Sequence, residues 1–103
     1  MELTGKCKED FKNYLLNDIT DFSYKYNYFI NLQDSMQYGV YVDFFDSVGI
    51  YVMDKHNEVA RRFYYDISTK PMSNDITSEC NLTRPQARAA AIEKANEIYN
   101  SKR

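Results

Sequence analysis

The chain has 103 residues, of which 44% are hydrophobic, 27% charged and 16% aromatic, and its formal net charge is −2. This length suits one compact domain, and the composition excludes intrinsic disorder, collagen and low-complexity sequence. No apolar run approaches the roughly 20 residues of a bilayer-spanning helix, and the first residues lack the basic-then-apolar pattern of a signal peptide. We therefore expect a single domain over residues 1–103 with a cytoplasmic location.

Charge is distributed unevenly along the chain. Residues 1–33 carry −1, residues 34–58 carry −4 and residues 59–103 carry +3. Such asymmetry is typical of two solvated faces of one fold, and it can also mark complementary patches for self-association or partner binding. The small negative total gives no reason to expect a membrane surface as partner, or a nucleic acid except through a protein complex.

The first predicted element is an amphipathic helix over about residues 6–17. Its apolar positions recur at helical spacing, and they are Leu3, Cys7, Phe11, Tyr14, Leu15 and Ile19. From Phe22 the apolar period changes to two, which predicts a long strand over residues 22–33, or two short strands with a kink.

A hairpin is predicted around the sequence 46–49. Apolar residues occupy even positions from Met36 to Phe44, and again at Ile50 and Val52. Asp46 suits the start of a type I turn and Gly49 the left-handed position that follows it, which predicts a three-residue loop. The even positions of both strands then share one face.

A second turn is predicted over residues 55–58. The apolar positions after it are odd, and a change of parity requires a loop of even length. A four-residue loop pairs Phe63 with Ile50 on the buried face and leaves Arg62 and Tyr64 outside.

The rest of the chain predicts a long loop followed by a helix. Residues 68–82 are polar and rich in turn formers, and we expect this loop to be the mobile or functional segment. Thr83 and Gln86 form a capping-box pattern that starts a helix running to about residue 100. The predicted fold is α+β, an antiparallel sheet of three or four strands between an N-terminal and a C-terminal helix.

Catalytic and metal-binding patterns are weak. His56 lies in a predicted turn without the partners of a nucleophile or a metal site, and Asp43, Asp46 and Asp54 are assigned to a strand surface and to turns. Cys7 and Cys80 are interpreted as reduced structural residues without disulfide or zinc spacing. We predict no enzymatic activity, no metal and no cofactor.

Several aromatic residues alternate away from the predicted core. If one side of the sheet is open, it carries a patch typical of protein interfaces, which favour Tyr, Phe, Met and Arg. The residues predicted to bind a partner are Tyr41, Asp43, Phe45, Tyr51, Met53, Arg62 and Tyr64, with Phe29 beside them. Arg84 and Arg88, at the unfavourable end of a helix for cations, are expected to be held by Tyr rings or a sheet Asp, with an external anion as the alternative.

A resemblance to small uncharacterised proteins of bacterial phages and mobile elements covers about a third of the chain and is carried by two segments, Tyr38–Ile50 and Thr83–Ala95. In those proteins a sheet packed by helices ends in an Ala-rich helix, and no catalytic residues come with the family. The resemblance implies a phage accessory protein in the host cytosol that binds and inhibits a host protein, such as a defence nuclease.

Two functions follow as hypotheses. The first is a non-catalytic interaction module that presents its aromatic and acidic sheet surface to a protein partner. The partner can also be a second copy of the same chain. The alternative is a small nucleic-acid-binding protein that uses the basic second half of the chain; its candidate residues are Arg61, Arg62, Lys70, Arg84 and Arg88.

Overall fold

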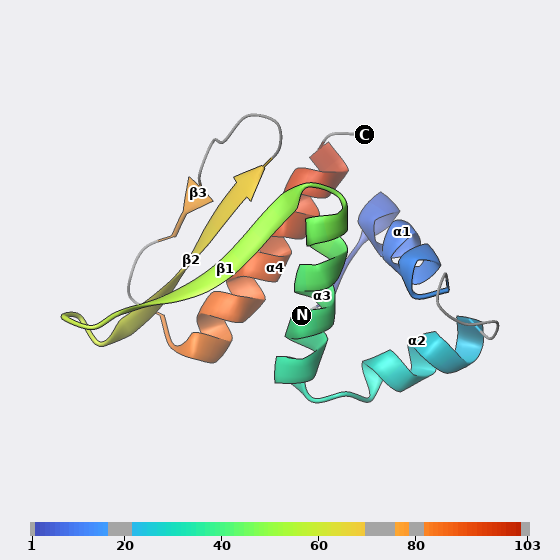
Figure 1. Cartoon of the computed structure of the whole chain (residues 1–103), viewed down its shortest axis with the longest axis horizontal. Coiled ribbons are helices and arrows are strands. Elements are labelled where there is room, and N and C mark those ends of the chain that lie inside the picture. Colours follow the sequence, from blue (N-terminus) through green and yellow to red (C-terminus); the bar gives the residue numbers. More distant parts are fainter. Residues whose placement is uncertain (1, 17–21, 70–75, 79–81, 102–103) are drawn as a thin grey trace.

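The computed structural model describes residues 2–16, 22–69, 76–78 and 82–101. Three helices come first, α1 (Gly5–Leu16), α2 (Phe22–Ile30) and α3 (Asp34–Ser47). The strands β1 (Ile50–Asn57), β2 (Arg62–Thr69) and β3 (Ile76–Thr77) follow, and α4 (Arg84–Ser101) ends the described chain. The three strands form one antiparallel sheet in the order β1-β2-β3, so the predicted α+β class is confirmed (Figure 1).

Two predicted strands are wrong, because residues 22–30 and 34–47 are helical. The buried positions of α3 are Tyr38, Tyr41, Phe44 and Phe45, which recur at helical spacing. In residues 34–47 the even positions from Met36 to Phe44 are apolar, which fits the period of two of a strand. The additional apolar residues at odd positions, Tyr41 and Phe45, make the same stretch compatible with a helix. The aromatic and β-branched side chains favour a strand locally, but packing in the folded chain overrides that preference.

The predicted loop at 47–49 closes a helix and not a hairpin. Val48 N donates to Phe45 O at 3.1 Å, and Gly49 N donates to Asp46 O at 3.2 Å. Gly49 has φ of 83°, the left-handed conformation that commonly ends a helix and that glycine adopts without strain. The prediction placed the left-handed residue correctly and assigned it to the wrong kind of turn.

The β1–β2 hairpin exists, but its predicted register is wrong. Phe63 pairs with His56 and not with Ile50, because the turn covers residues 58–61. The Asn57 side chain accepts hydrogen bonds from Val59 N and Ala60 N at 3.0 and 3.1 Å, which favours a turn after Asn57. Both loops have four residues, so the predicted assignment of side chains to the two faces survives the shift.

Two predicted helices are confirmed. α1 covers the expected range, and Cys7, Phe11 and Leu15 are buried along it. At the start of α4, Thr83 N donates to Gln86 Oε1 at 3.0 Å and Gln86 N donates to Thr83 Oγ1 at 3.3 Å, the expected capping box.

The core brings buried side chains of the four helices together with the covered face of the sheet. The Phe11 ring centroid is 4.9 Å from those of Phe29 and Tyr41 and 5.3 Å from that of Phe44. The alanines of α4 provide a flat stripe, since Ala87, Ala91 and Ala95 are fully buried. Along this stripe α4 packs close to the sheet, where it contacts both β1 and β2.

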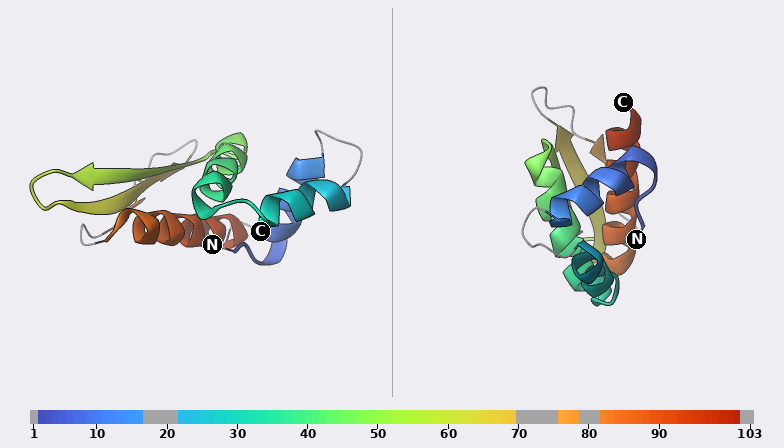
Figure 2. Two further views of the ribbon diagram at one scale, coloured as in Figure 1. Left: turned by 90° about the horizontal axis from the view of Figure 1, so that it is seen from below. Right: turned by 90° about the vertical axis from the view of Figure 1, so that its right-hand side faces the viewer.

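The hairpin extends beyond the helices that cover it. In two perpendicular views its turn lies past the beginning of α4, while α1 and α2 lie at the other end of the molecule (Figures 1 and 2). The domain is correspondingly elongated and flat, with extents of 47 × 31 × 19 Å. Of the predicted loop 68–82, residues 76–77 form β3, and residues 70–75 and 79–81 lie outside the described residues.

Candidate interaction surface

The two faces of the sheet differ in what covers them. Ile50, Val52 and Ile67 point toward the helices and are at most 4% exposed. The alternating side chains therefore point away from α3 and α4, and no described helix lies over that side in Figure 2. We call this side the open sheet face, and its residues are Tyr51, Met53, Lys55, Arg62, Tyr64 and Asp66.

The open sheet face is apolar in its middle and ordered by polar contacts. Met53 is 44% exposed and lies opposite Asp66, and Lys55 lies opposite Tyr64. The Lys55 ammonium is 3.2 Å from one oxygen of Asp66, and Thr77 Oγ1 donates to the other at 3.2 Å. Asp66 thus has partners on β1 and β3 and joins the three strands on this face.

The residues predicted to bind a partner do not all reach this face. Tyr51, Met53, Arg62 and Tyr64 belong to it, as expected. The expectation that Tyr41 and Phe45 alternate away from the core is wrong, because they are 4% and 0% exposed on α3. Phe29 is buried as well, and Asp43 is exposed on α3. Successive side chains are about 100° apart around a helix but 180° apart along a strand. The strand pattern therefore assigned these helical residues to the wrong side.

Arg88 is held as expected, by a Tyr ring and a sheet Asp, whereas Arg84 lies over a Phe ring instead of a Tyr ring. The Arg84 guanidinium lies 4.7 Å from the centroid of the Phe63 ring. The Arg88 guanidinium lies 5.0 Å from that of Tyr38, and its Nε is 3.4 Å from Asp54 Oδ2. Arg88 is therefore used inside the fold, to join α4 to α3 and β1.

Tyr38 completes this internal contact. Burial, and after it the charge of Asp54, raises the pKa of the Tyr38 hydroxyl well above its ordinary range. Tyr38 therefore stays neutral and gives Arg88 the face of an uncharged ring.

The candidate catalytic residues do not converge. Asp43 and Asp46 are exposed on α3, whereas Asp54 pairs with Arg88. Desolvation, and then the charge of Asp43, raises the pKa of Asp46. His56 is exposed near the end of β1, and its ring centroid is 4.6 Å from that of Phe63.

Cys7 is a free, fully buried thiol. Burial, followed by the charge of Asp10, raises its pKa to about 12, so it lacks the low pKa of a reactive cysteine. Cys80 lies outside the described residues.

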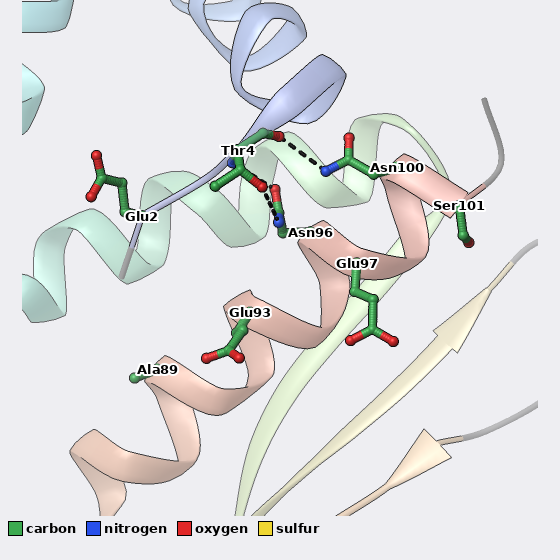
Figure 3. A pocket seen from close by; sticks show the side chains of 8 residues that line it. All are labelled: Glu2, Thr4, Ala89, Glu93, Asn96, Glu97, Asn100 and Ser101. Atoms are coloured by element: carbon green, nitrogen blue, oxygen red, sulfur yellow. Dashed lines mark hydrogen bonds between the residues drawn. The ribbon is translucent and has the colours of Figure 1, made fainter.

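A concave region, separate from the open sheet face, lies between the N-terminal segment and α4 (Figure 3). Its volume is about 750 Å³, and it is lined by Glu2, Thr4, Ala89, Glu93, Asn96, Glu97, Asn100 and Ser101. Asn96 Oδ1 accepts from Thr4 N at 3.0 Å, Asn96 Nδ2 donates to Thr4 Oγ1 at 3.0 Å, and Asn100 Nδ2 donates to Thr4 O at 3.0 Å. These amides fasten the start of α1 to α4, which gives the walls of this groove a structural role.

Sequence reasoning missed the contacts that depend on register. The Lys55–Asp66 ion pair and the stack of Arg84, Phe63 and His56 follow only once Phe63 is placed opposite His56. The signal that could have located them was Asn57, whose side chain favours a turn immediately after it.

Comparisons with known proteins add no assignment: no protein-family model matches the chain, and no curated protein or solved structure is significantly similar to it. Within residues 2–16, 22–69, 76–78 and 82–101, no three His, Cys, Asp or Glu side chains are grouped to hold a metal ion. None of the helices in that part of the chain is both long and apolar enough to cross a membrane.

Proposed function

We propose that this protein is a non-catalytic interaction module that binds a protein partner through the open sheet face. The observation that carries the proposal is the register of the hairpin, which places Tyr51, Met53 and Tyr64 on the side of the sheet opposite the buried Ile50, Val52 and Ile67. Tyr, Met and Arg are the residue types enriched in protein interfaces. Rigid aromatic side chains bury a large area at a small cost in conformational entropy, so they are suited to anchor a partner.

The order of this face supports binding by a preformed surface. The strands that carry the aromatic side chains are joined by the backbone ladder and by the contacts of Asp66 with Lys55 and Thr77. A surface that is already ordered loses little freedom when a partner covers it.

The charges near this face differ from those first expected. Asp43 and Asp46, expected in the hairpin, belong to α3, whereas the sheet face itself carries Lys55, Arg62 and Asp66. The contribution of acidic residues to steering would therefore come from α3, beside the apolar contact area.

The biological setting is part of the proposal and rests on the resemblance of the two sequence segments described above. On that basis the protein is a phage or mobile-element accessory protein, and its partner is a bacterial host defence protein that it inhibits by covering a functional surface.

The experiment is affinity capture from a bacterial cytosolic extract with wild-type protein and two double variants, quantified by mass spectrometry. M53A with Y64A removes the centre of the open sheet face. M36A with Y28A is the matched control, because it deletes the same residue types at positions that are 56% and 59% exposed on α3 and α2. We expect the sheet variant to recover the specific partner at least about tenfold less well, which corresponds to about 1.4 kcal/mol.

The control variant should recover the partner at the wild-type level. Thermal unfolding of both variants separates loss of binding from loss of fold, and Met53→Lys, at a half-exposed position, provides a second disruption that leaves the core untouched. Equal recovery by M53A/Y64A, Met53→Lys and wild type would show that the open sheet face is not the interface.

A further inference from the structure

The far end of the β1–β2 hairpin is a rigid projection with an apolar tip. It extends beyond the helices in Figure 1 and in the left view of Figure 2. Val59, in the turn, is 96% exposed. The two hydrogen bonds to Asn57 Oδ1 fix the first half of the turn, and Arg61 holds a left-handed φ of 55° in the second half. A non-glycine residue in this conformation stores strain, so the turn has one defined shape.

Guanidinium groups gather at this end. Arg61 and Arg62 follow the tip directly, and Arg84 joins them from α4 by stacking on Phe63. We call this region the basic end, defined by Val59, Arg61, Arg62, Phe63 and Arg84.

The neighbouring carboxylates leave the basic end with positive charge. Asp54 is paired with Arg88 and Asp66 with Lys55. Once these two ion pairs are set aside, two described carboxylates remain near this end, Glu58 in the turn and Asp34, which lines a small pocket with Pro85 and Arg88. Arg61, Arg62 and Arg84 thus outnumber the two carboxylates, although the whole chain has a net charge of −2.

The opposite end of the hairpin is acidic. Asp43 and Asp46 lie in the last turns of α3, immediately before β1 begins. The molecule is therefore polarised along the hairpin, and a polyanion would be attracted to one end and repelled from the other. Such polarity favours an end-on approach by the tip.

We propose that the basic end binds a DNA duplex by placing the tip of the hairpin in its major groove. That groove is about 12 Å wide and admits a two-stranded β-ribbon. Arg61, Arg62 and Arg84 contact phosphates along its rims, and Val59 provides an apolar contact with base edges. Phosphate contacts dominate this arrangement, so binding depends on salt and only weakly on sequence. The basic end shares Arg62 with the open sheet face, but Met53 and Tyr64, on which the proposed protein interface depends, take no part in this inference.

The test is fluorescence anisotropy of a labelled DNA duplex about 20 base pairs long, titrated with the full chain. For about three phosphate contacts, we expect affinity to fall about 40-fold between about 50 and 200 mM salt. Charge reversal by R61E with R62E should weaken binding at least about tenfold at the lower salt concentration. R61N with R62Q is the neutral variant, and it keeps a residue at position 61 that tolerates the left-handed conformation.

The matched control reverses two cations elsewhere, K8E with K12E on α1, at the far end of the molecule from the tip. This control has the same net charge as the R61E/R62E variant and should bind the duplex much more tightly. Absence of duplex binding at low salt overturns the proposal, as does equal weakening by both double variants. Tighter binding of a single strand, or equally tight binding of a poly-glutamate peptide, overturns insertion into a groove. Capture of the protein partner by M53A/Y64A is measured separately, so the two proposals can fail independently.

Discussion

The two faces of the β1–β2 hairpin are built from similar residues and have different surroundings. On one face Ile50, Val52 and Ile67 are sealed against α3 and α4, and on the other Met53 is 44% exposed beside Tyr51 and Tyr64. Hydrophobicity alone therefore does not distinguish core from surface in this protein. The alternation of side chains along each strand, together with the side on which the helices pack, makes the distinction.

The largest expected effect is on the covered side. Phe45→Ala deletes a ring that is 0% exposed and lies 5.2 Å, between centroids, from Phe44. We expect the free energy of unfolding to fall by about 3–5 kcal/mol, from lost burial and the cavity left behind. Urea denaturation measures this change. A loss below about 1 kcal/mol would contradict the burial of this helix face.

The buried thiol of Cys7 tests how well the covered side excludes solvent. Its pKa is raised from 9.0 to about 12. In a Cys80→Ser variant near pH 8, we expect Ellman's reagent to label Cys7 about a thousandfold more slowly in the folded protein than in guanidinium, because each pKa unit changes the thiolate fraction tenfold. Labelling at the unfolded rate would contradict the buried position of Cys7.

The raised pKa of Cys7 also determines how the stability of the protein changes with pH. The folded pKa of Cys7 lies above the unfolded value, so its thiol favours the folded state below pH 9.0, and this contribution is lost as pH rises toward about 12. Cys7→Ala should remove that part of the alkaline loss of stability, and an unchanged alkaline profile would contradict the assignment.

A smaller effect is expected where α1 is fastened to α4. Asn96 is 9% exposed and exchanges two hydrogen bonds with Thr4. Asn96→Ala leaves the Thr4 backbone N–H and hydroxyl without this partner, which should cost about 1–3 kcal/mol of stability. Hydrogen exchange should show the loss first at the start of α1. Faster exchange at the hairpin, with α1 unchanged, would contradict this connection.

The smallest expected effect is on the open side. Met53→Ala should change stability by no more than about 0.5 kcal/mol, and the same holds for Met36→Ala at a similarly exposed position on α3. Thermal unfolding compares the two variants directly. A loss for Met53→Ala close to that for Phe45→Ala would show that the open sheet face is part of the core.

The elements that sequence reasoning predicted correctly have strong local signals. α1 has apolar residues at a single helical period, and α4 begins with the reciprocal bonds between Thr83 and Gln86. The outward positions of Tyr51, Met53, Arg62 and Tyr64 followed from parity, which an error in the position of an even loop does not change. The contacts of Arg84 with a ring and of Arg88 with a ring and an Asp followed from the unfavourable placement of cations in the first turns of a helix.

The errors lie where the sequence supports two periods at once. Residues 34–47 contain apolar side chains at both odd and even positions, so a strand pattern and a helix pattern are both present. Tyr41 and Phe45 were assigned to the surface by the strand pattern and are buried by the helix. The same ambiguity led to the prediction of a strand over residues 22–33, of which Phe22–Ile30 form α2.

The amino-acid sequence by itself determined the α+β class, the two terminal helices, and the faces of the β1–β2 hairpin, because each depends on interactions within a few residues or on parity. The tertiary structure alone decided that α3 is a helix, and it separated the aromatic residues into a buried cluster around Phe11 and a half-buried pair, Tyr51 and Tyr64, on the open sheet face. The physical reason is that local preferences left both conformations open for α3, and burial of its aromatic side chains against α1 and the sheet selected the helix.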